Sequence, residues 1–220
     1  MFLILTPLLK VLALMRTLFS NLLFCSCCLF YIQNSFAGEF QDEMTYSLGM
    51  VNASYAEAQS SLKGENVSLP ASGSIASISG NVQWKFSPGF ERSLYLAGTF
   101  PLLPNPAGSY FGVHSGIEFY FGGKMGSRMR VENSGTTLKL KSGSVFFWGL
   151  EGGVGYLAYT TETAKKTDIL LDLGAFGGGN YVISDKWQLR GQAGFGRGTG
   201  VQTTVTEIKI FLGLTRFIGD

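Results

Sequence analysis

The sequence predicts an all-β fold, an eight-stranded antiparallel transmembrane β-barrel of the up-and-down type, preceded by a cleaved signal peptide. Three observations lead to this class. Apolar and polar residues alternate with a period of two in blocks of about ten residues, which is typical of strands in membrane barrels. The 220 residues include 30 glycines and 14% aromatic residues. The long apolar run needed for an export signal stands at the N-terminus.

Residues 1–37 form the first predicted element. They contain no acidic residue, carry Lys10 and Arg16, and run apolar from Leu18 to Ile32. The small residues of Ser35-Phe36-Ala37 suit signal peptidase, so we expect cleavage before Gly38. Because the signal is complete from Met15 onward, Met15 is an alternative start. The other interpretation, an uncleaved anchor, is disfavoured because the run is shorter than the roughly 20 residues that span a bilayer.

Cleavage changes the composition of the mature chain, residues 38–220. All three cysteines leave with the signal peptide, so disulfides cannot stabilise the exported protein. The signal also removes two of the 17 basic residues and none of the 15 acidic ones, which leaves the mature chain without net charge. A nucleic acid or another polyanionic partner is therefore not expected.

The mature chain then divides into eight predicted strands. The alternation is clearest at 78–86, where Ile78, Val82 and Trp84 oppose Ser79, Asn81 and Gln83, and at 187–195. The other six blocks follow the same rule less cleanly, and stretches rich in Gly, Pro, Ser, Asn and Asp separate them. In chain order the eight strands are 44–51, 78–86, 94–100, 111–121, 146–159, 170–182, 187–195 and 207–217.

Three features favour a membrane barrel over a soluble barrel or sandwich. Aromatic residues stand near the strand ends on the apolar face, as interfacial girdles require. The connections 52–74 and 160–167 are long whereas 184–186 is short, as expected of loops at one end and turns at the other. Glycines crowd the other face, which suits a narrow interior; they are Gly112, Gly116, Gly149, Gly153, Gly155, Gly174, Gly178 and Gly194.

Two segments give specific structural expectations. Residues 172–180 and 188–194 both place even-numbered residues inward, so a three-residue turn, Ser184-Asp185-Lys186, should set Asn180 opposite Arg190. Residues 122–142 are too long and charged for a tight turn. We interpret them as an extramembrane hairpin or insertion that continues the fourth and fifth strands, because segments of about six residues cannot span a bilayer. Eight strands are therefore preferred to ten.

The mature chain resembles the small bacterial outer-membrane β-barrel proteins of the OmpA/OmpX type. The most specific piece is the terminus Phe211-Leu212-Gly213-Leu214-Thr215-Arg216-Phe217, which is similar to the last-strand signal read by the barrel-assembly machinery. The resemblance implies roles for Gly213 and Phe217 in that signal. Three residues follow Phe217, unlike the usual pattern, and Phe217 shares a face with Glu207 and Lys209. We therefore expect either a bulge that shifts the register of this strand, or a mixture of polar and apolar residues on its faces near the rim.

The inward polar residues predict a plugged lumen. Side chains about fill an eight-stranded barrel, and buried charges must be paired. The expected salt-bridged network consists of Lys85, His114, Glu118, Glu151, Asp172, Arg190 and Lys209. These residues are close to balanced in sign, so a wide pore is not expected.

Few residues point to chemistry, and no catalytic residue, metal site or cofactor is predicted. His114 is the only histidine, and the adjacent Ser115 points to the opposite face of the strand, which excludes a Ser/His pair there. A lipid A-modifying enzyme would need a serine from another strand, such as Ser79. One histidine and no cysteine leave carboxylates without EF-hand spacing as metal ligands.

The sequence therefore predicts a non-enzymatic, Gram-negative cell-envelope protein of the outer membrane. The leading hypothesis is a structural or surface-interaction role, in which the 52–74 loop meets an extracellular ligand. The alternative is a porin-like narrow pore for small solutes or ions, and a lipid A-modifying enzyme is a minor alternative. The expected partners are outer-membrane lipid, lipopolysaccharide and the barrel-assembly machinery.

Overall fold

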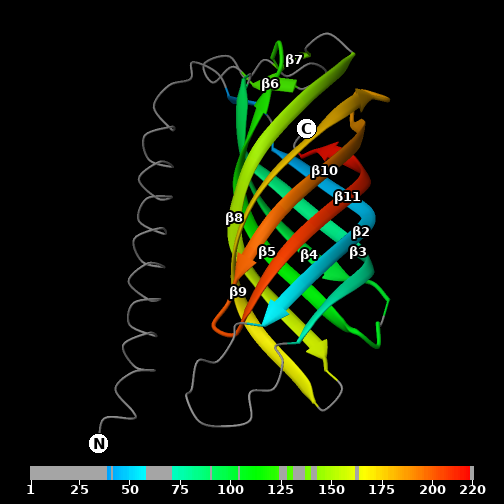
Figure 1. Ribbon diagram of the computed structural model, residues 1–220. Coiled ribbons are helices and arrows are strands. Elements are labelled where there is room, and N and C mark those ends of the chain that lie inside the picture. Colours follow the sequence, from blue (N-terminus) through cyan, green and yellow to red (C-terminus); the bar gives the residue numbers. More distant parts are fainter. Residues whose placement is uncertain are drawn as a thin grey trace, which may run out of the picture. The chain divides into compact units, whose positions relative to one another are not determined.

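The computed structural model describes residues 39–40, 42–57, 71–89, 91–103, 105–123, 128–130, 137–139, 143–161 and 164–218. The predicted signal peptide lies outside the described residues. Within them, no helix is long and apolar enough to cross a membrane. Eight strands pair antiparallel into one closed barrel in the order β10-β11-β2-β3-β4-β5-β8-β9 (Figure 1). The predicted fold class is confirmed.

Strand pairing follows chain order around the barrel, apart from the insertion between β5 and β8. The barrel strands are β2 (Glu43–Glu57), β3 (Ser72–Pro88), β4 (Arg92–Pro101), β5 (Gly108–Tyr120), β8 (Ser144–Thr160), β9 (Lys165–Val182), β10 (Trp187–Thr199) and β11 (Thr203–Phe217). Because β10 pairs with β9 and β11 pairs with β2, the sheet closes and has no free edge.

The register of β9 and β10 agrees with the sequence prediction. Arg190 pairs with Asn180, and the Ile183 amide donates to the Trp187 carbonyl at 3.1 Å across the short turn. The pairing of β11 is regular up to Arg216 on the β10 side and up to Phe217 on the β2 side, so this strand contains no bulge. Phe217 is buried at the rim of the barrel. Of the two explanations offered for Phe217, an inward-facing aromatic at the rim is therefore the one observed.

Several strands are longer than predicted, so the loops that connect them are shorter than expected. Ala56 pairs with Ser72, so both ends of the predicted 52–74 loop belong to strands, and residues 58–70 lie outside the described residues. The β8–β9 connection is only 161–164, which is shorter than expected. The prediction failed because these strand ends extend beyond the apolar band, where outward residues such as Asn52 and Ser54 are polar and the alternation fades.

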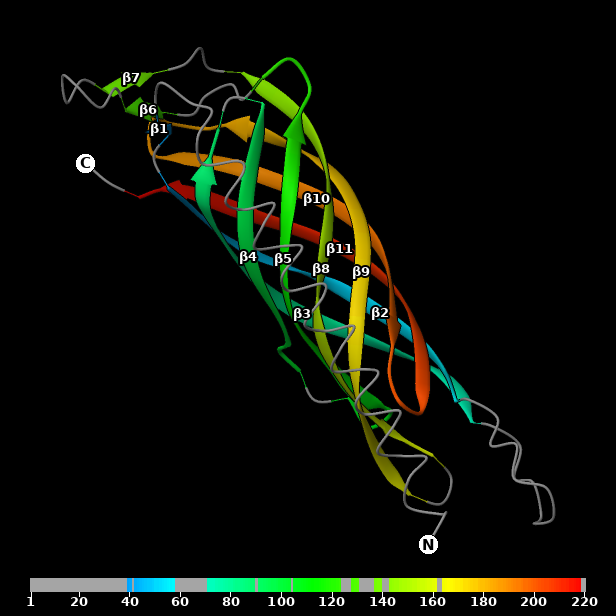
Figure 2. The same cartoon turned by 90° about the vertical axis from the view of Figure 1, so that its left-hand side faces the viewer.

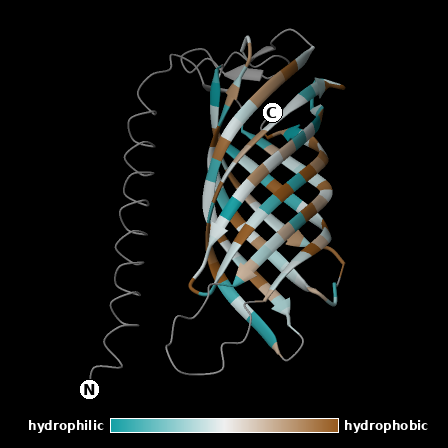
Figure 3. Ribbon diagram, in the orientation of Figure 1, coloured by the Kyte–Doolittle hydropathy of each residue, from teal (hydrophilic) through white to brown (hydrophobic). Residues whose placement is uncertain are grey.

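Hydrophobic and hydrophilic residues alternate along the strands (Figure 3), and the exposed residues of the outer wall are mainly apolar whereas many of the buried, inward ones are polar. On β11, Ile208, Ile210, Leu212 and Leu214 are 43–60% exposed, whereas Glu207, Lys209 and Thr215 are buried. Aromatic side chains line both borders of the outer band; Phe119 stacks on Trp148 near one border, and Phe111 packs against Tyr156 near the other. An apolar outer band with aromatic borders is the surface of a barrel that crosses a lipid bilayer.

A second, three-stranded sheet lies at the end of the barrel where β2 begins and β11 ends, which we call the termini end (Figure 2). It is formed by β1 (Glu39–Phe40), β6 (Arg128–Arg130) and β7 (Thr137–Lys139) in the order β1-β6-β7. Within the 122–142 segment, Arg128 pairs with Lys139 in an antiparallel hairpin. The hairpin does not continue β5 and β8 as predicted, because it pairs with β1 instead. The residues between β6 and β7, 131–136, lie outside the described residues.

Candidate functional site in the barrel lumen

The lumen gathers charged side chains from seven of the described strands, because every second residue of each strand points inward. All seven predicted lumen residues lie there: Lys85, His114, Glu118, Glu151, Asp172, Arg190 and Lys209. They do not form one network. They fall into two groups, one nearer the termini and one nearer the opposite, loop-bearing end.

The termini-side cluster consists of Glu43, Lys85, Glu118 and Arg190. The Arg190 guanidinium holds Glu118 through two bonds, Nη1–Oε1 at 3.2 Å and Nη2–Oε2 at 2.6 Å. The Lys85 Nζ lies 2.8 Å from Glu118 Oε1 and 3.3 Å from Glu43 Oε2. All four side chains are at most 1% exposed. Two cations therefore face two carboxylates, and the cluster is balanced in charge.

The same cluster is fixed by aromatic side chains. The Arg190 guanidinium lies 3.8 Å from the centroid of the Phe147 ring, and Lys85 donates to the Tyr120 hydroxyl at 3.1 Å. Tyr120 in turn donates to Ser93 at 3.1 Å. Cation–π contact is stronger where the cation is withdrawn from water, as it is here. Aromatic side chains, as well as carboxylates, thus hold both cations of the termini-side cluster.

The loop-side cluster consists of His114, Glu151, Asp172, Glu207 and Lys209. Lys209 Nζ lies 2.9 Å from Glu207 Oε2 and 3.1 Å from Glu151 Oε1, and His114 Nε2 lies 3.4 Å from Asp172 Oδ2. Two tyrosine hydroxyls donate to carboxylates of the cluster, Tyr110 to Asp172 at 2.7 Å and Tyr95 to Glu151 at 3.0 Å.

Two apolar groups fill the lumen around these clusters. The loop-side group contains Ile75, Leu157, Leu170, Val205 and the ring of Tyr159, all at most 2% exposed. The termini-side group contains Tyr95, Tyr120, Phe147 and Phe176. The lumen is therefore packed in its apolar layers as well as in its polar ones.

Interior glycines make room for these large side chains. The Phe176 ring lies over Gly149, and the Phe147 ring lies over Gly178, where an added Cβ would overlap the ring. The His114 imidazole occupies the corresponding space at Gly112 and Gly153. The glycine excess of the sequence thus reflects close approach inside a narrow barrel.

A third polar group lies at the loop-bearing rim, beyond the apolar band. Glu57 accepts from Lys166 Nζ and from the Tyr159 hydroxyl, both at 2.7 Å. These two hydrogen bonds hold the pKa of Glu57 below its ordinary value of 4.5. Nearby, Asp168 accepts from the amides of Val201, Gln202 and Thr203, which fixes the β10–β11 turn.

Sequence reasoning missed Glu43, Glu207, Tyr110 and the rim residues. Glu43 stands one residue before the predicted start of its strand, and extending the period-two pattern by that residue would have placed it inward. Glu207 shares the face of Lys209 but was not included in the lumen set. The tyrosines were not predicted because an aromatic ring in a barrel strand is compatible with either wall.

The structure does not bring Ser79 to His114. Ser79 shares a hydrogen bond with Ser77 at 3.1 Å, whereas His114 contacts the Tyr110 hydroxyl at 3.3 Å and Asp172. The predicted assembly residues Gly213 and Phe217 both lie on β11. Gly213 pairs with Ser47, whose side chain occupies the space that a Cβ at Gly213 would need.

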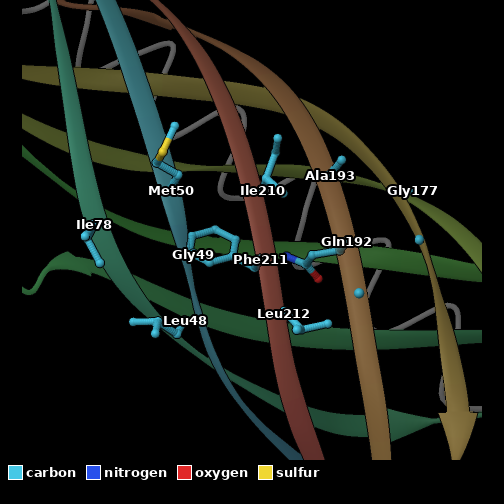
Figure 4. Close-up of a pocket in the computed structure, with 12 residues that line it drawn as sticks. Leu48, Gly49, Met50, Ile78, Gly177, Gln192, Ala193, Ile210, Phe211 and Leu212 are labelled. Atoms are coloured by element: carbon cyan, nitrogen blue, oxygen red, sulfur yellow. The ribbon is translucent and has the colours of Figure 1, made fainter.

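The barrel also has an open groove of about 820 Å³ (Figure 4). Exposed apolar side chains line it, including Leu48, Met50, Ile210 and Leu212, together with glycines of β9 and β10. Its lining lacks the converging charged groups that mark the lumen. The chemistry of the described residues therefore lies in the lumen clusters.

No protein-family model matches the sequence, and no curated protein sequence matches it. Among solved structures, the chain is similar to Neisserial surface protein A (NspA), with 9% identity and a TM-score of 0.49, over 79% of this chain and 97% of that one. It is similar to the outer membrane protein OprG from Pseudomonas aeruginosa, with 9% identity and a TM-score of 0.44, over 84% and 100% of the two chains. It is also similar to the outer membrane protease OmpT from Escherichia coli, with 9% identity and a TM-score of 0.41, over 84% and 99%.

Proposed function

We propose that this protein is a non-enzymatic outer-membrane barrel with a closed lumen, which acts as a scaffold for the segment between β2 and β3 at the cell surface. Its direct partners are then outer-membrane lipid and lipopolysaccharide around the apolar band, and the barrel-assembly machinery during insertion. The burial of His114 in the lumen, at 2% exposure, supports the absence of lipid A chemistry, because the lipid would have to reach that side chain.

The packing of the lumen is the observation that carries this proposal. Arg190, Lys85, Tyr95, Tyr110, His114 and Phe147 are each 0–2% exposed, although all belong to the inner wall. Side chains that lined a water-filled channel would remain accessible to water. Because these residues come from both clusters and both apolar groups, they support a lumen closed at several levels, as expected for eight strands.

We predict that the folded protein gives no ionic conductance above background in planar bilayers. The physical reason is that opening a path would require separating the buried ion pairs of the lumen, which costs several kcal/mol. Insertion is checked on the same preparation by comparing unboiled and boiled gel mobility. Discrete conductance steps whose frequency rises with the amount of folded protein would instead favour the narrow-pore alternative.

The extension of β2 and β3 supports the surface role. The two strands remain paired to Ala56 and Ser72, beyond the apolar band, and Glu57 is tied to β9 through Lys166 at 2.7 Å. This end of the barrel is opposite the one where β2 begins and β11 ends, and outer-membrane barrels carry their longer loops on the extracellular side. The proposal therefore places the ends of β2 and β3 on the extracellular side and assigns contact with an extracellular ligand to the connection between them.

An epitope tag inserted between Asn66 and Val67 is expected to be labelled by antibody on intact cells. A matched tag in the turn at Asp185 should be labelled only after the outer membrane is permeabilised, because that turn lies at the termini end. Equal labelling of the two tags on intact cells, or labelling of the Asp185 tag alone, would contradict the proposed orientation. Both tagged proteins must keep the gel mobility of the folded barrel.

A further inference from the structure

The loop-side cluster carries more negative than positive charge, unlike the termini-side cluster. Three carboxylates, those of Glu151, Asp172 and Glu207, face the single ammonium of Lys209. Even a protonated His114 would leave one negative charge without a partner in this set. An uncompensated charge in a buried site is costly, so the cluster favours an additional cation.

Three side chains of this cluster converge, and two of them have a buried oxygen without a hydrogen-bond partner. One ligand atom each of His114, Asp172 and Glu207 lies within 4.8 Å of the others, and all three residues are buried. Among the described residues, Asp172 Oδ1 and Glu207 Oε1 have no hydrogen-bond partner. Both side chains are at most 2% exposed. Buried carboxylate oxygens without donors are rare, and here two of them belong to one site.

We propose that His114, Asp172 and Glu207 bind a divalent cation of the zinc type inside the lumen. One imidazole nitrogen and two carboxylate oxygens are a ligand set that zinc accepts, at bond lengths of about 2.0–2.2 Å. Small side-chain movements bring the three ligand atoms from their present spacing to a common ion. No sequence motif marks this site, because its three ligands stand far apart in the chain, on β5, β9 and β11.

Neighbouring groups hold the ligands in place. The Tyr110 hydroxyl donates to Asp172 Oδ2 at 2.7 Å, and so orients that carboxylate. The Lys209 ammonium contacts both Glu207 and Glu151. Because it is divided between two carboxylates, it neutralises Glu207 only in part, and the remaining negative charge of Glu207 can attract the cation. Gly155 and Gly198 border the Asp172 carboxylate, and a side chain at either position would occupy its space. Such outer contacts fix the geometry of metal ligands.

The test is zinc retention by the full barrel. The unfolded protein is refolded into detergent with Zn²⁺, folded material is selected by unboiled gel mobility, loose metal is removed with EDTA, and bound zinc is measured by mass spectrometry. We expect about one zinc per barrel for the unchanged protein. Glu207→Gln and Asp172→Asn should lose it, and Tyr110→Phe should weaken zinc affinity by about 10–100-fold.

Glu57→Gln is the matched control, because it makes the same chemical change at the rim and should retain zinc fully. His114→Gln is a second ligand variant, in case a carboxylate variant fails to fold. Zinc-free unchanged protein would overturn the proposal, as would equal retention by the unchanged and the Glu207→Gln proteins. If the unchanged protein binds no zinc while Glu207→Gln folds more stably, the cluster is neutralised by protons, and the proposal is likewise wrong.

Discussion

Replacing Glu118 by glutamine is expected to lower the free energy of unfolding by about 3–5 kcal/mol, the usual cost of breaking a buried ion pair from one side. Glu118 binds both Arg190, at 2.6 Å, and Lys85, at 2.8 Å, and its side chain is fully buried. Its loss leaves two buried cations with Glu43 as their remaining carboxylate. The measurement is urea unfolding of the barrel in lipid vesicles, followed by gel mobility.

Two variants make this result specific. Glu91→Gln makes the same change at an exposed position next to β4 and should alter stability by less than about 0.5 kcal/mol. The double variant Glu118→Gln, Arg190→Met removes both partners, so it should cost less than the sum of the single changes. Additive costs would show that Glu118 and Arg190 are not energetically coupled, and a Glu118→Gln protein as stable as the Glu91→Gln protein would show that the termini-side cluster does not stabilise the lumen.

Replacing Leu212 by arginine is expected to lower the unfolding free energy in vesicles by about 2–4 kcal/mol, the cost of a charge on the lipid face near the bilayer midplane. Leu212 is 60% exposed and lies in the middle of the outward apolar series of β11. On a soluble protein an arginine at so exposed a site would change stability little. The same vesicle unfolding experiment measures the difference.

Thr206→Arg is the matched control for this variant. Thr206 lies on the same outward face of β11, beyond Ile208, where the wall becomes polar. Near an interface the cost of arginine falls to about 0–1 kcal/mol. Equal losses for Leu212→Arg and Thr206→Arg would contradict an apolar band embedded in lipid, because the cost must depend on depth.

Alternation, together with the aromatic borders, the connection lengths and the length of strand that a bilayer requires, predicted the barrel class, the number of strands and most of the inward charged residues. Period two divides each strand into two faces, and the shared parity of Asp172, Asn180, Gln188 and Arg190 was enough to predict the β9–β10 register. The strand prediction failed where polar and apolar residues no longer alternate. The end of β2 and the start of β3 carry small and polar residues on both faces, so the alternation there does not mark them as strand.

Only the tertiary structure decided which inward residues meet. Closure of the barrel sets Glu118 of β5 against Arg190 of β10, and it brings His114, Asp172 and Glu207 together from three strands. A strand sequence specifies the face on which a side chain lies, but the partner across a lumen depends on barrel stagger, strand tilt and the way interior rings pack over glycines. Most of the charged residues of the lumen could therefore be predicted from the sequence. Their division into one cluster with balanced charge and one with net negative charge could not.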